Sequence, residues 1–360
     1  MTRRHRIGHI AATGLGLQVA AIEDHLRRHS LGIAGADAPT RLLIGRAANR
    51  QYIRMARRHV GIVESALLSS ALQSVRPIIR HFGGYREITP DLWAYEEFAR
   101  STASLAFTPE EEARGRANLE AMGIGANDWF VCFHVRDSGA PGGTATAYKR
   151  ASLDRYLGAV AWLTEQGGFA LRMGTDVATS LPNLNDPRVI DYAARWRSDF
   201  MDVYLCAKCR FFLGSSAGLA YLAIAFDVPV AIANLAPLGN PPQSARDRFV
   251  PKLMCRKGIP LAFDDIHRLG LFGADGRRAA EFGIEYRDDD SEDIIALCKS
   301  MLHGDPPGAT PLQERYRDRF FANCPGFRFA PLIDGHFALK YRHLMPEGET
   351  SAVDLAPRCD

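Results

Sequence analysis

The sequence predicts an α/β protein with parallel sheets flanked by helices, and three observations support this fold class. The continuous apolar run at residues 129–135 (WFVCFHV) is typical of a strand buried on both faces, as strands of a parallel sheet are. Apolar strands and helical segments alternate over residues 129–235, which indicates a doubly wound sheet. The length of 360 residues and the hydrophobic content of 47% are sufficient for two domains.

The N-terminal third shows a weaker form of the same alternation. Its firmest signal is a helix start at Thr108, which is followed by proline and three glutamates, with Gly123 as the stop. Thr89 is a second expected cap, for a helix that ends at Arg100. The strands expected here are 6–10, 41–45 and 60–63, and the helices are 17–28, 49–58, 89–100 and 109–121.

The rest of the chain is organised around residues 199–237, where a helix, a strand, a turn of small residues, a second helix and a second strand follow one another. Residues 240–262 are rich in proline and basic residues and are expected to form a loop. The strands expected in this part are 129–135, 169–172, 189–191, 210–213 and 228–233, and the helices are 153–166, 202–209, 219–226, one from 263 onward and 291–303. A linker at 303–312 and a final helix with an extension at 313–344 complete the chain.

Composition excludes several classes of function. A net charge of +3 over this length gives no footprint for nucleic acid, so no nucleic-acid partner is expected. The arginines near the start could make a weak peripheral contact with an anionic membrane, although a solvated basic face is the favoured interpretation. No apolar run reaches the length of a transmembrane helix, and residues 7–17 make a poor secretion signal. We therefore expect a cytoplasmic protein whose contact with the inner membrane, where it makes one, is peripheral.

The seven cysteines are dispersed and odd in number, which favours a reducing compartment over a disulfide framework. Cys206 and Cys209 form a CxxC pair, but no second pair follows at zinc spacing. We interpret both as buried thiols of the core.

The small-residue turn at 214–218 (GSSAG) between a strand and a helix favours a phosphate or diphosphate, since glycine admits a ligand and hydroxyls can donate to it. The alternative is a serine cap on an ordinary crossover. Two further strands end in polar loops, and carboxyl ends of parallel strands are where ligands bind in such sheets. The polar residues at these three ends are Arg136, Asp137 and Ser138, then Arg172 and Gly174, and then Ser215, Ser216, Ala217 and Gly218.

The charged members of this set have expected roles. The guanidinium groups of Arg136 and Arg172 offer forked donors to a diphosphate. Asp137 either orients Arg136 or contacts a ligand hydroxyl, and we favour the first role. The only Asp-x-Asp pattern considered for a metal, at 288–290, precedes a helix and is better explained as an acidic cap, so no metal site or other cofactor is expected.

Several strings resemble a family of bacterial glycosyltransferases with the two-domain GT-B architecture. They are FTPEEEARGRANLEAMGI (107–124), FHVRDS (133–138), LRMG (171–174), VIDYAARWRSDFMDVYLCAKCRFFLGSSAGL (189–219) and FDVPVAIANLAPL (226–238). His134-Val135-Arg136 is also similar to a motif of fucosyltransferases, and residues 215–229 are similar to a heptosyltransferase motif. The family usually carries Tyr-Arg-Asn where this chain has Tyr148-Lys149-Arg150.

The resemblance implies two Rossmann-like domains that face a cleft holding a nucleotide-sugar. It divides the chain into an acceptor-side domain at 1–126, a donor-binding domain at 127–305, an extension at 306–345 that packs back on the first domain, and a disordered tail at 346–360.

It also implies transfer of a sugar from a nucleotide-diphosphate donor to a glycan, a lipid-linked acceptor or a small molecule, as in surface polysaccharide synthesis. Arg136 would act on the leaving diphosphate, Asp191 would shape the donor side, and His9 in the first turn is the candidate general base. An inactive nucleotide-sugar-binding protein and a nucleotide-sugar epimerase on the same fold are the alternatives.

Overall fold

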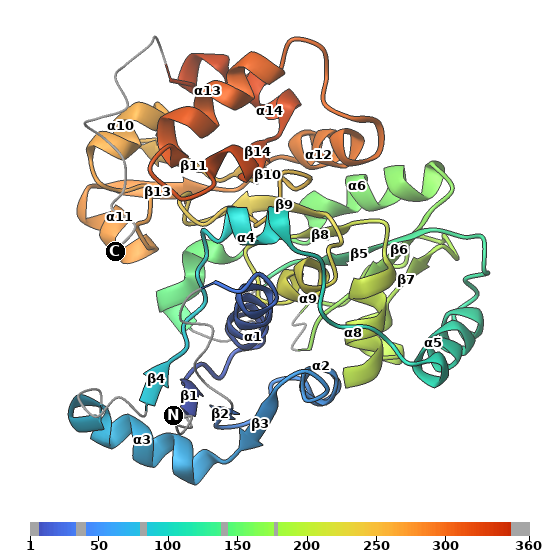
Figure 1. Ribbon diagram of the computed structural model, residues 1–360. Helices are drawn as coiled ribbons and strands as arrows, with labels where there is room; N and C mark the ends of the chain where they lie inside the picture. Colours follow the sequence, from blue (N-terminus) through green and yellow to red (C-terminus); the bar gives the residue numbers. More distant parts are fainter. Residues whose placement is uncertain (1–6, 34–40, 80–84, 138–142, 176–178, 347–360) are drawn as a thin grey trace.

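The computed structural model describes residues 7–33, 41–79, 85–137, 143–175 and 179–346. They form an α/β protein with two parallel sheets flanked by helices, which confirms the predicted fold class (Figure 1). The predicted disordered tail, except for residue 346, lies outside these residues.

The smaller sheet comes from the N-terminal part of the described chain and has the strand order β3-β2-β1-β4, all parallel. The predicted helix at 89–100 begins only at Tyr95, six residues later than the sequence predicts, and the Ile88 N–H before it donates to the carbonyl of His9 in β1. The elements are β1 (Ile7–Ile10), α1 (Leu15–Ser30), β2 (Arg41–Ile44), α2 (Arg50–Ala56), β3 (Gly61–Glu64), α3 (Ala66–Ile79), β4 (Tyr85–Glu87) and α4 (Tyr95–Arg100).

Helix α5 (Pro109–Ala121) connects the two sheets and starts where the sequence predicts. The Thr108 hydroxyl accepts a hydrogen bond from the Glu111 N–H at 3.2 Å, and the Glu111 carboxylate accepts one from the Thr108 N–H at 2.9 Å. This reciprocal pair satisfies two backbone donors that the first helical turn would otherwise leave without partners.

The larger sheet has the described strand order β14-β10-β9-β8-β5-β6-β7, again all parallel. Its central strands are apolar and buried on both faces, as the sequence predicts for residues 129–135. The elements up to its middle are β5 (Phe130–His134), the 3-10 helix η2 (Gly143–Lys149), α6 (Asp154–Glu165), β6 (Phe169–Arg172), β7 (Val189–Ile190), α7 (Tyr192–Arg195), α8 (Asp199–Lys208), β8 (Phe212–Gly214), α9 (Ala220–Ala225) and β9 (Val230–Leu235).

Residues 240–262 are not the loop that the sequence predicts. They contain β10 (Arg248–Pro251), which joins the larger sheet, and β11 (Leu253–Arg256) and β12 (Ile259–Pro260). Strand β11 pairs with β12 on one side and with β13 (Ile284–Arg287) on the other, in a small antiparallel sheet. Helices α10 (Phe263–Arg268) and α11 (Gly276–Glu281) lie between these strands in the sequence.

The C-terminal part of the described chain returns to the larger sheet. Strand β14 pairs with β10 at the edge of that sheet, while η3 packs on α4 of the N-terminal part. The extension therefore contacts both parts of the molecule. Its elements, with the helix before it, are α12 (Ser291–His303), α13 (Thr310–Phe321), η3 (Phe327–Phe329), β14 (Leu332–Ile333), α14 (Gly335–Lys340) and η4 (Arg342–Leu344).

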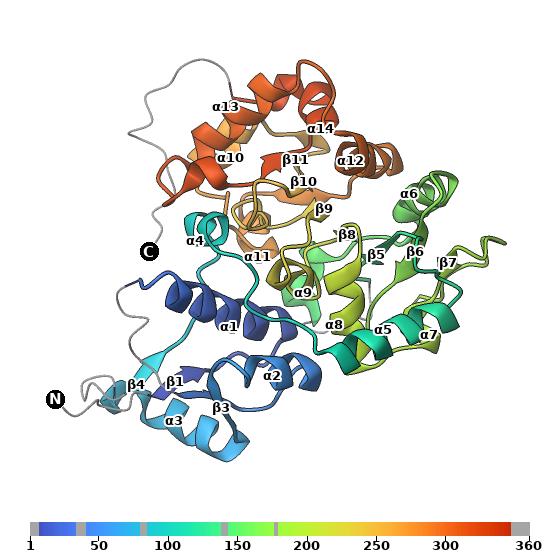
Figure 2. The same cartoon turned by 45° about the vertical axis from the view of Figure 1, so that its right-hand side comes forward.

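The two parallel sheets face each other through their helices. Helix α1 packs on α9, and α2 packs on α8 (Figures 1 and 2). A Cβ atom on Gly16 would lie only 2.5 Å from the Cα of Gly218, so the backbones of the two parts are in contact there. This arrangement brings the loops after β1 and β2 opposite the loops after β5 and β8.

Candidate functional site

A cavity of about 840 Å³ lies between the two sheets. The loops that line it follow the carboxyl ends of parallel strands on both sides, which is where ligands bind in sheets of this kind. Its lining comes from residues 13–17 after β1, 46–49 after β2, 134 and 136 after β5, 174 and 175 after β6, 215–218 after β8, and 235–237 after β9, together with parts of η2, α8 and α9.

Positive side chains gather at one part of this cavity. Arg136 and Lys149 both line it, and the Arg136 guanidinium donates to the Thr146 hydroxyl at 3.1 Å. Burial, with the charge of nearby Arg150, lowers the pKa of Arg136, and burial, with the charge of Arg136, lowers the pKa of Lys149. Cations that are held together in this way favour a ligand with several negative charges.

The serine turn completes this part of the cavity. The Ser215 hydroxyl accepts from the Arg136 N–H at 2.8 Å, and the Ser216 hydroxyl accepts from the Ala236 N–H at 2.9 Å. Because both oxygens accept from the backbone, each hydroxyl hydrogen can be donated elsewhere. Helix α9 has only six residues and makes a small dipole, so any anion seat here depends on hydroxyls and cations more than on the helix end that the sequence favours.

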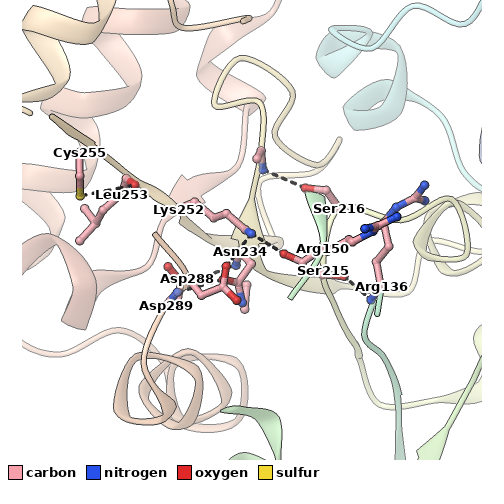
Figure 3. A network of polar contacts seen from close by, with 12 residues as sticks. Arg136, Arg150, Ser215, Ser216, Asn234, Lys252, Leu253, Cys255, Asp288 and Asp289 are labelled. Atoms are coloured by element: carbon pink, nitrogen blue, oxygen red, sulfur yellow. Dashed lines mark hydrogen bonds and ion pairs between the residues drawn. The ribbon is translucent and has the colours of Figure 1, made fainter. Parts of the chain in front are cut away.

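A buried polar network fixes the loops that carry these groups (Figure 3). The Lys252 ammonium donates to the carbonyl of Arg150 and to the Asp288 carboxylate, the latter at 2.6 Å. Asn234 and Asp289 exchange two hydrogen bonds, each from a backbone N–H to the other's side chain. Lys252 therefore connects the chain just after η2 to the segment before α12. The predicted capping role of residues 288–290 is confirmed for Asp290, which caps α12.

His134 also lines the cavity, at the last position of β5. Its Nδ1 lies 3.0 Å from the carbonyl oxygen of Met173, which can only accept, so Nδ1 carries the hydrogen. Burial lowers the pKa of the imidazole, which is therefore neutral at pH 7 with Nε2 as its basic nitrogen.

Asp202 on α8 is the carboxylate among the described lining residues. It accepts from the Tyr192 hydroxyl at 2.8 Å and pairs with Arg197 at 3.1 Å. Burial raises the pKa of this carboxyl to about 6, so it can exchange protons near neutral pH.

The structure brings together about half of the residues predicted for the site. Those that line the cavity are Arg136, Gly174, Ser215, Ser216, Ala217 and Gly218. Ser138 lies outside the described residues.

Arg172 and Asp191 do not line the cavity among the described residues. Arg172 is buried, and its guanidinium lies 3.6 Å from the Asp191 carboxylate and 4.0 Å from that of Asp137. It also donates to the carbonyl of Thr179 at 2.5 Å, while Asp191 caps α7. These three charged groups hold the loop after β6 in place, an arrangement that argues against the predicted contact of Arg172 and Asp191 with a donor.

His9 is likewise absent from the described lining of the cavity. Its side chain is fully buried, with Nε2 at 2.8 Å from the Ser69 hydroxyl and Nδ1 at 3.1 Å from the Tyr85 hydroxyl. Burial lowers its pKa. Within the smaller sheet, His9 on β1 thus connects α3 and β4 to that strand. This placement fits a structural role rather than that of the predicted general base.

The described cysteines are free thiols and all of them are buried, which agrees with the interpretation of Cys206 and Cys209 as core residues. Over the same residues, His, Cys, Asp and Glu side chains form no group of three or more that could hold a metal ion. Every described helix falls short of what is needed to cross a membrane.

Solved structures with a similar architecture are glycosyltransferases. A glycosyl transferase family 9 protein from Veillonella parvula shares 12% identity with a TM-score of 0.40, over 63% of this chain and 80% of that one. ADP-heptose lipopolysaccharide heptosyltransferase II from E. coli shares 13% with a TM-score of 0.45, over 71% and 93%. The E. coli heptosyltransferase WaaC, solved with ADP, shares 10% with a TM-score of 0.35, over 69% and 91%.

At these identities the likeness concerns the fold alone. No protein-family model matches the chain, and no curated protein matches it either.

Three functional candidates escape the predicted set of site residues. His134 and Lys149 both occur in stretches that resemble glycosyltransferase motifs. His134 ends an apolar strand and Lys149 follows a glycine-rich loop, so neither stands out from its local sequence as a site residue. Asp202 lies within a helix whose spacing indicates only a buried side. The signal that could have found them is their position next to the carboxyl ends of β5 and β8 once the sheet order is known.

Proposed function

We propose that this protein is a glycosyltransferase that binds a nucleotide-diphosphate sugar in the cavity between its two sheets. The observation that carries the proposal is that Arg136, Lys149 and the two serines of the turn, Ser215 and Ser216, all line that cavity, with the Ser215 hydroxyl 2.8 Å from the Arg136 backbone nitrogen. The cavity volume of about 840 Å³ lies in the range of sites for ligands of this size.

The chemistry of glycosyl transfer matches this arrangement. When the bond between the anomeric carbon and the phosphate oxygen breaks, negative charge grows on the departing diphosphate. Arg136, Lys149 and the two hydroxyls would meet that charge with fixed donors, and such donors stabilise a transition state more than the ground state. We propose that these groups stabilise the leaving group without a metal ion.

Two lining residues can take a proton from an acceptor hydroxyl. Nε2 of neutral His134 is a base at pH 7, and Asp202 is mostly ionised there because its pKa is about 6. Both replace His9 as the candidates for a general base. The acceptor, a glycan, lipid-linked sugar or small molecule, would enter beside residues 13–17 and 46–49 of the smaller sheet.

A donor-hydrolysis assay tests the proposal. The protein is incubated with ADP-, UDP- and GDP-sugars, and release of free sugar is followed by mass spectrometry. We expect hydrolysis of one nucleotide class and a loss of about 10²-fold in Arg136→Ala, since one transition-state donor is removed. The matched control is Arg210→Ala, which removes an exposed arginine that does not line the cavity.

Each other outcome has a meaning. Tight binding without turnover would favour a nucleotide-sugar-binding protein, and conversion of the bound sugar into an isomer would favour an epimerase. A wild-type protein that binds none of the nucleotides, or an equal loss in both variants, would contradict the proposal.

A further inference from the structure

Helix η2 brings two groups of the proposed donor site to the cavity. Thr146 and Lys149 both line it, and the Thr146 hydroxyl accepts a hydrogen bond from the Arg136 guanidinium at 3.1 Å. At seven residues η2 is longer than most 3-10 helices, whose hydrogen bonds are poorly aligned. Its position therefore depends on contacts with other elements.

Helix α11 and strand β13 provide the first of these contacts. The Tyr148 ring lies against the Tyr286 ring, with 5.4 Å between the ring centres and 36° between the planes. Gly276 at the start of α11 leaves room for this pair, since a Cβ atom there would lie 2.9 Å from Cβ of Tyr148. The Tyr286 hydroxyl donates to the carbonyl of Ala274 at 2.8 Å, which fixes the ring that Tyr148 contacts.

Lys252 provides the second contact. It is 3% exposed and precedes β11, the strand that pairs with β13. Its ammonium donates to the carbonyl of Arg150 and to the Asp288 carboxylate, the latter at 2.6 Å (Figure 3). The end of η2 is therefore held at Tyr148 and at Arg150 by the small antiparallel sheet and α11.

Lys149 stands between these two attached positions. Its ammonium lies 5.6 Å from the centre of the Tyr148 ring, within the range at which an aromatic face attracts a cation. The direction of the Lys149 side chain therefore depends on where Tyr148 is held. We call Gly276, Tyr286 and Lys252 the η2 platform.

We propose that Tyr286 is a positioning residue of the donor site, which acts through Tyr148 to place Lys149 and Thr146 at the diphosphate. The η2 platform does not belong to the described lining of the cavity, so its effect on a ligand is indirect. This proposal rests on the proposed function, in which Lys149 contacts the charge of the donor.

Hydrogen exchange of the full chain without ligand tests the attachment of η2. In Tyr286→Ala the amides of residues 146–150 should exchange at least about tenfold faster, because the ring that holds Tyr148 is lost. Tyr286→Phe keeps the ring and should stay within about threefold of the wild-type rate. The matched control is Tyr341→Ala, which removes a tyrosine that is paired with Phe337 at 4.6 Å outside η2 and its platform, and should leave these amides unchanged.

A double-mutant cycle tests the path through Lys149. Calorimetric titration with ADP, UDP and GDP identifies the nucleoside diphosphate that the wild type binds best, and that compound is the probe. Tyr286→Ala should weaken its binding at least about tenfold, while Tyr286→Phe should bind like the wild type. In the Lys149→Met background the same alanine change should cost less than about threefold, because the group that Tyr286 positions is already absent.

The outcomes separate this proposal from the proposed function. Unchanged exchange of residues 146–150 in Tyr286→Ala, or equal losses of binding in the two backgrounds, would overturn this proposal and leave the proposed function standing. An equally large loss of binding in Tyr341→Ala would overturn it as well, since general loosening of the fold would then explain the effect. A wild-type protein that binds none of the three nucleotides would overturn the proposed function and this proposal with it.

Discussion

Two cationic residues of the cavity, Arg136 and Lys149, are partly buried, which makes their charged forms less favourable than in water. Burial lowers the pKa of both Arg136 and Lys149, and a neighbouring charge adds to the effect in each case, Arg150 for Arg136 and Arg136 for Lys149. Neighbouring buried cations repel each other, and an anionic ligand bound between them would offset this repulsion. Such a site therefore favours binding but makes the unliganded protein less stable. Lys252 nearby is buried too, but its ammonium has the Asp288 carboxylate as a partner at 2.6 Å.

Removing one of these cations should therefore stabilise the protein and weaken its binding of a nucleotide. Lys149→Met should raise the free energy of unfolding by about 1 kcal/mol, because a partly buried charge beside Arg136 is removed. The same change should weaken binding of the nucleoside diphosphate at least about tenfold. Urea unfolding and calorimetric titration measure the two effects, with Lys299→Met on the exposed side of α12 as the control. Lower stability together with unchanged binding would contradict the assignment of Lys149 to the site.

His25 on α1 provides a pH-dependent prediction. The side chain is 8% exposed, and burial lowers its pKa to about 4. In the unfolded chain its pKa is about 6.5, so below that value the unfolded state takes up a proton that the folded state excludes. This contribution to stability is complete above pH 6.5 and is lost as the pH falls towards 4.

We expect this histidine to account for about 2 kcal/mol of stability lost between pH 7 and pH 5. Urea unfolding at the two pH values should show a smaller drop for His25→Gln than for the wild type by that amount. The absolute stability of the variant does not matter here, because the readout is the difference between the two pH values. Equal drops in both proteins would show that His25 is not the group responsible.

At the scale of elements, α1 and the turn after β8 are in close backbone contact between the two parallel sheets. A Cβ atom on Gly16 would lie 2.5 Å from the Cα of Gly218 and 3.0 Å from the ring of Tyr221. Both backbones line the cavity at this point. Any side chain at residue 16 must therefore move α1 away from the turn.

Gly16→Ser should lower the free energy of unfolding by about 1–3 kcal/mol, the usual range for overpacking. Gly14→Ser is the matched control, because nothing lies within 4 Å of its Cβ position and serine is a good residue at the N-cap of α1. The control should be neutral or slightly more stable. Thermal unfolding compares the stabilities of the two variants. Equal unfolding temperatures would show that α1 and the turn can move apart at residue 16 without loss of stability.

Much of the element pattern follows from local sequence. Strands β5, β6 and β9 are apolar runs, and α5 begins with a capping box that Thr108 and Glu111 make visible in the sequence. Strands β10 to β12 could not be found in this way. They have two to four residues each, and proline or arginine occupies some of their positions. Pairing with β9 and β14 makes β10 a strand, and pairing with β13 does the same for β11, whereas β12 forms as the second arm of a hairpin with β11.

The same limit applies to the site. The sequence places Arg136, Gly174, Ser215 and Ser216 at strand ends, and the structure brings them to one cavity. It places Arg172 at a strand end too, but cannot show that Asp137 and Asp191 surround it. His9 was predicted as a base from its position in the first turn, and only the tertiary structure reveals its contacts with Ser69 and Tyr85.

At the scale of the whole molecule, an ion pair between buried Arg27 and partly exposed Asp227 connects the two parts. Arg27 of α1 is fully buried, and its guanidinium contacts Glu23 at 2.9 Å and Asp227, which follows α9, at 2.8 Å. The second oxygen of Asp227 accepts from the Ala103 N–H at 2.6 Å. One carboxylate thus holds α1, the chain after α4 and the end of α9 together.

Asp227→Asn should lower the free energy of unfolding by about 2 kcal/mol, because it leaves the buried Arg27 with one charged partner fewer. Asparagine keeps the positive φ of 57° at this position, so backbone strain does not contribute. Glu281→Gln breaks an exposed pair with Arg278 and should change the free energy by less than about 0.5 kcal/mol. Urea unfolding followed by both circular dichroism and tryptophan fluorescence makes the comparison. Because the pair joins the two parts, the two probes should separate in Asp227→Asn and coincide in the wild type, whereas coincidence in both proteins with an unchanged midpoint would show that other contacts hold the parts together.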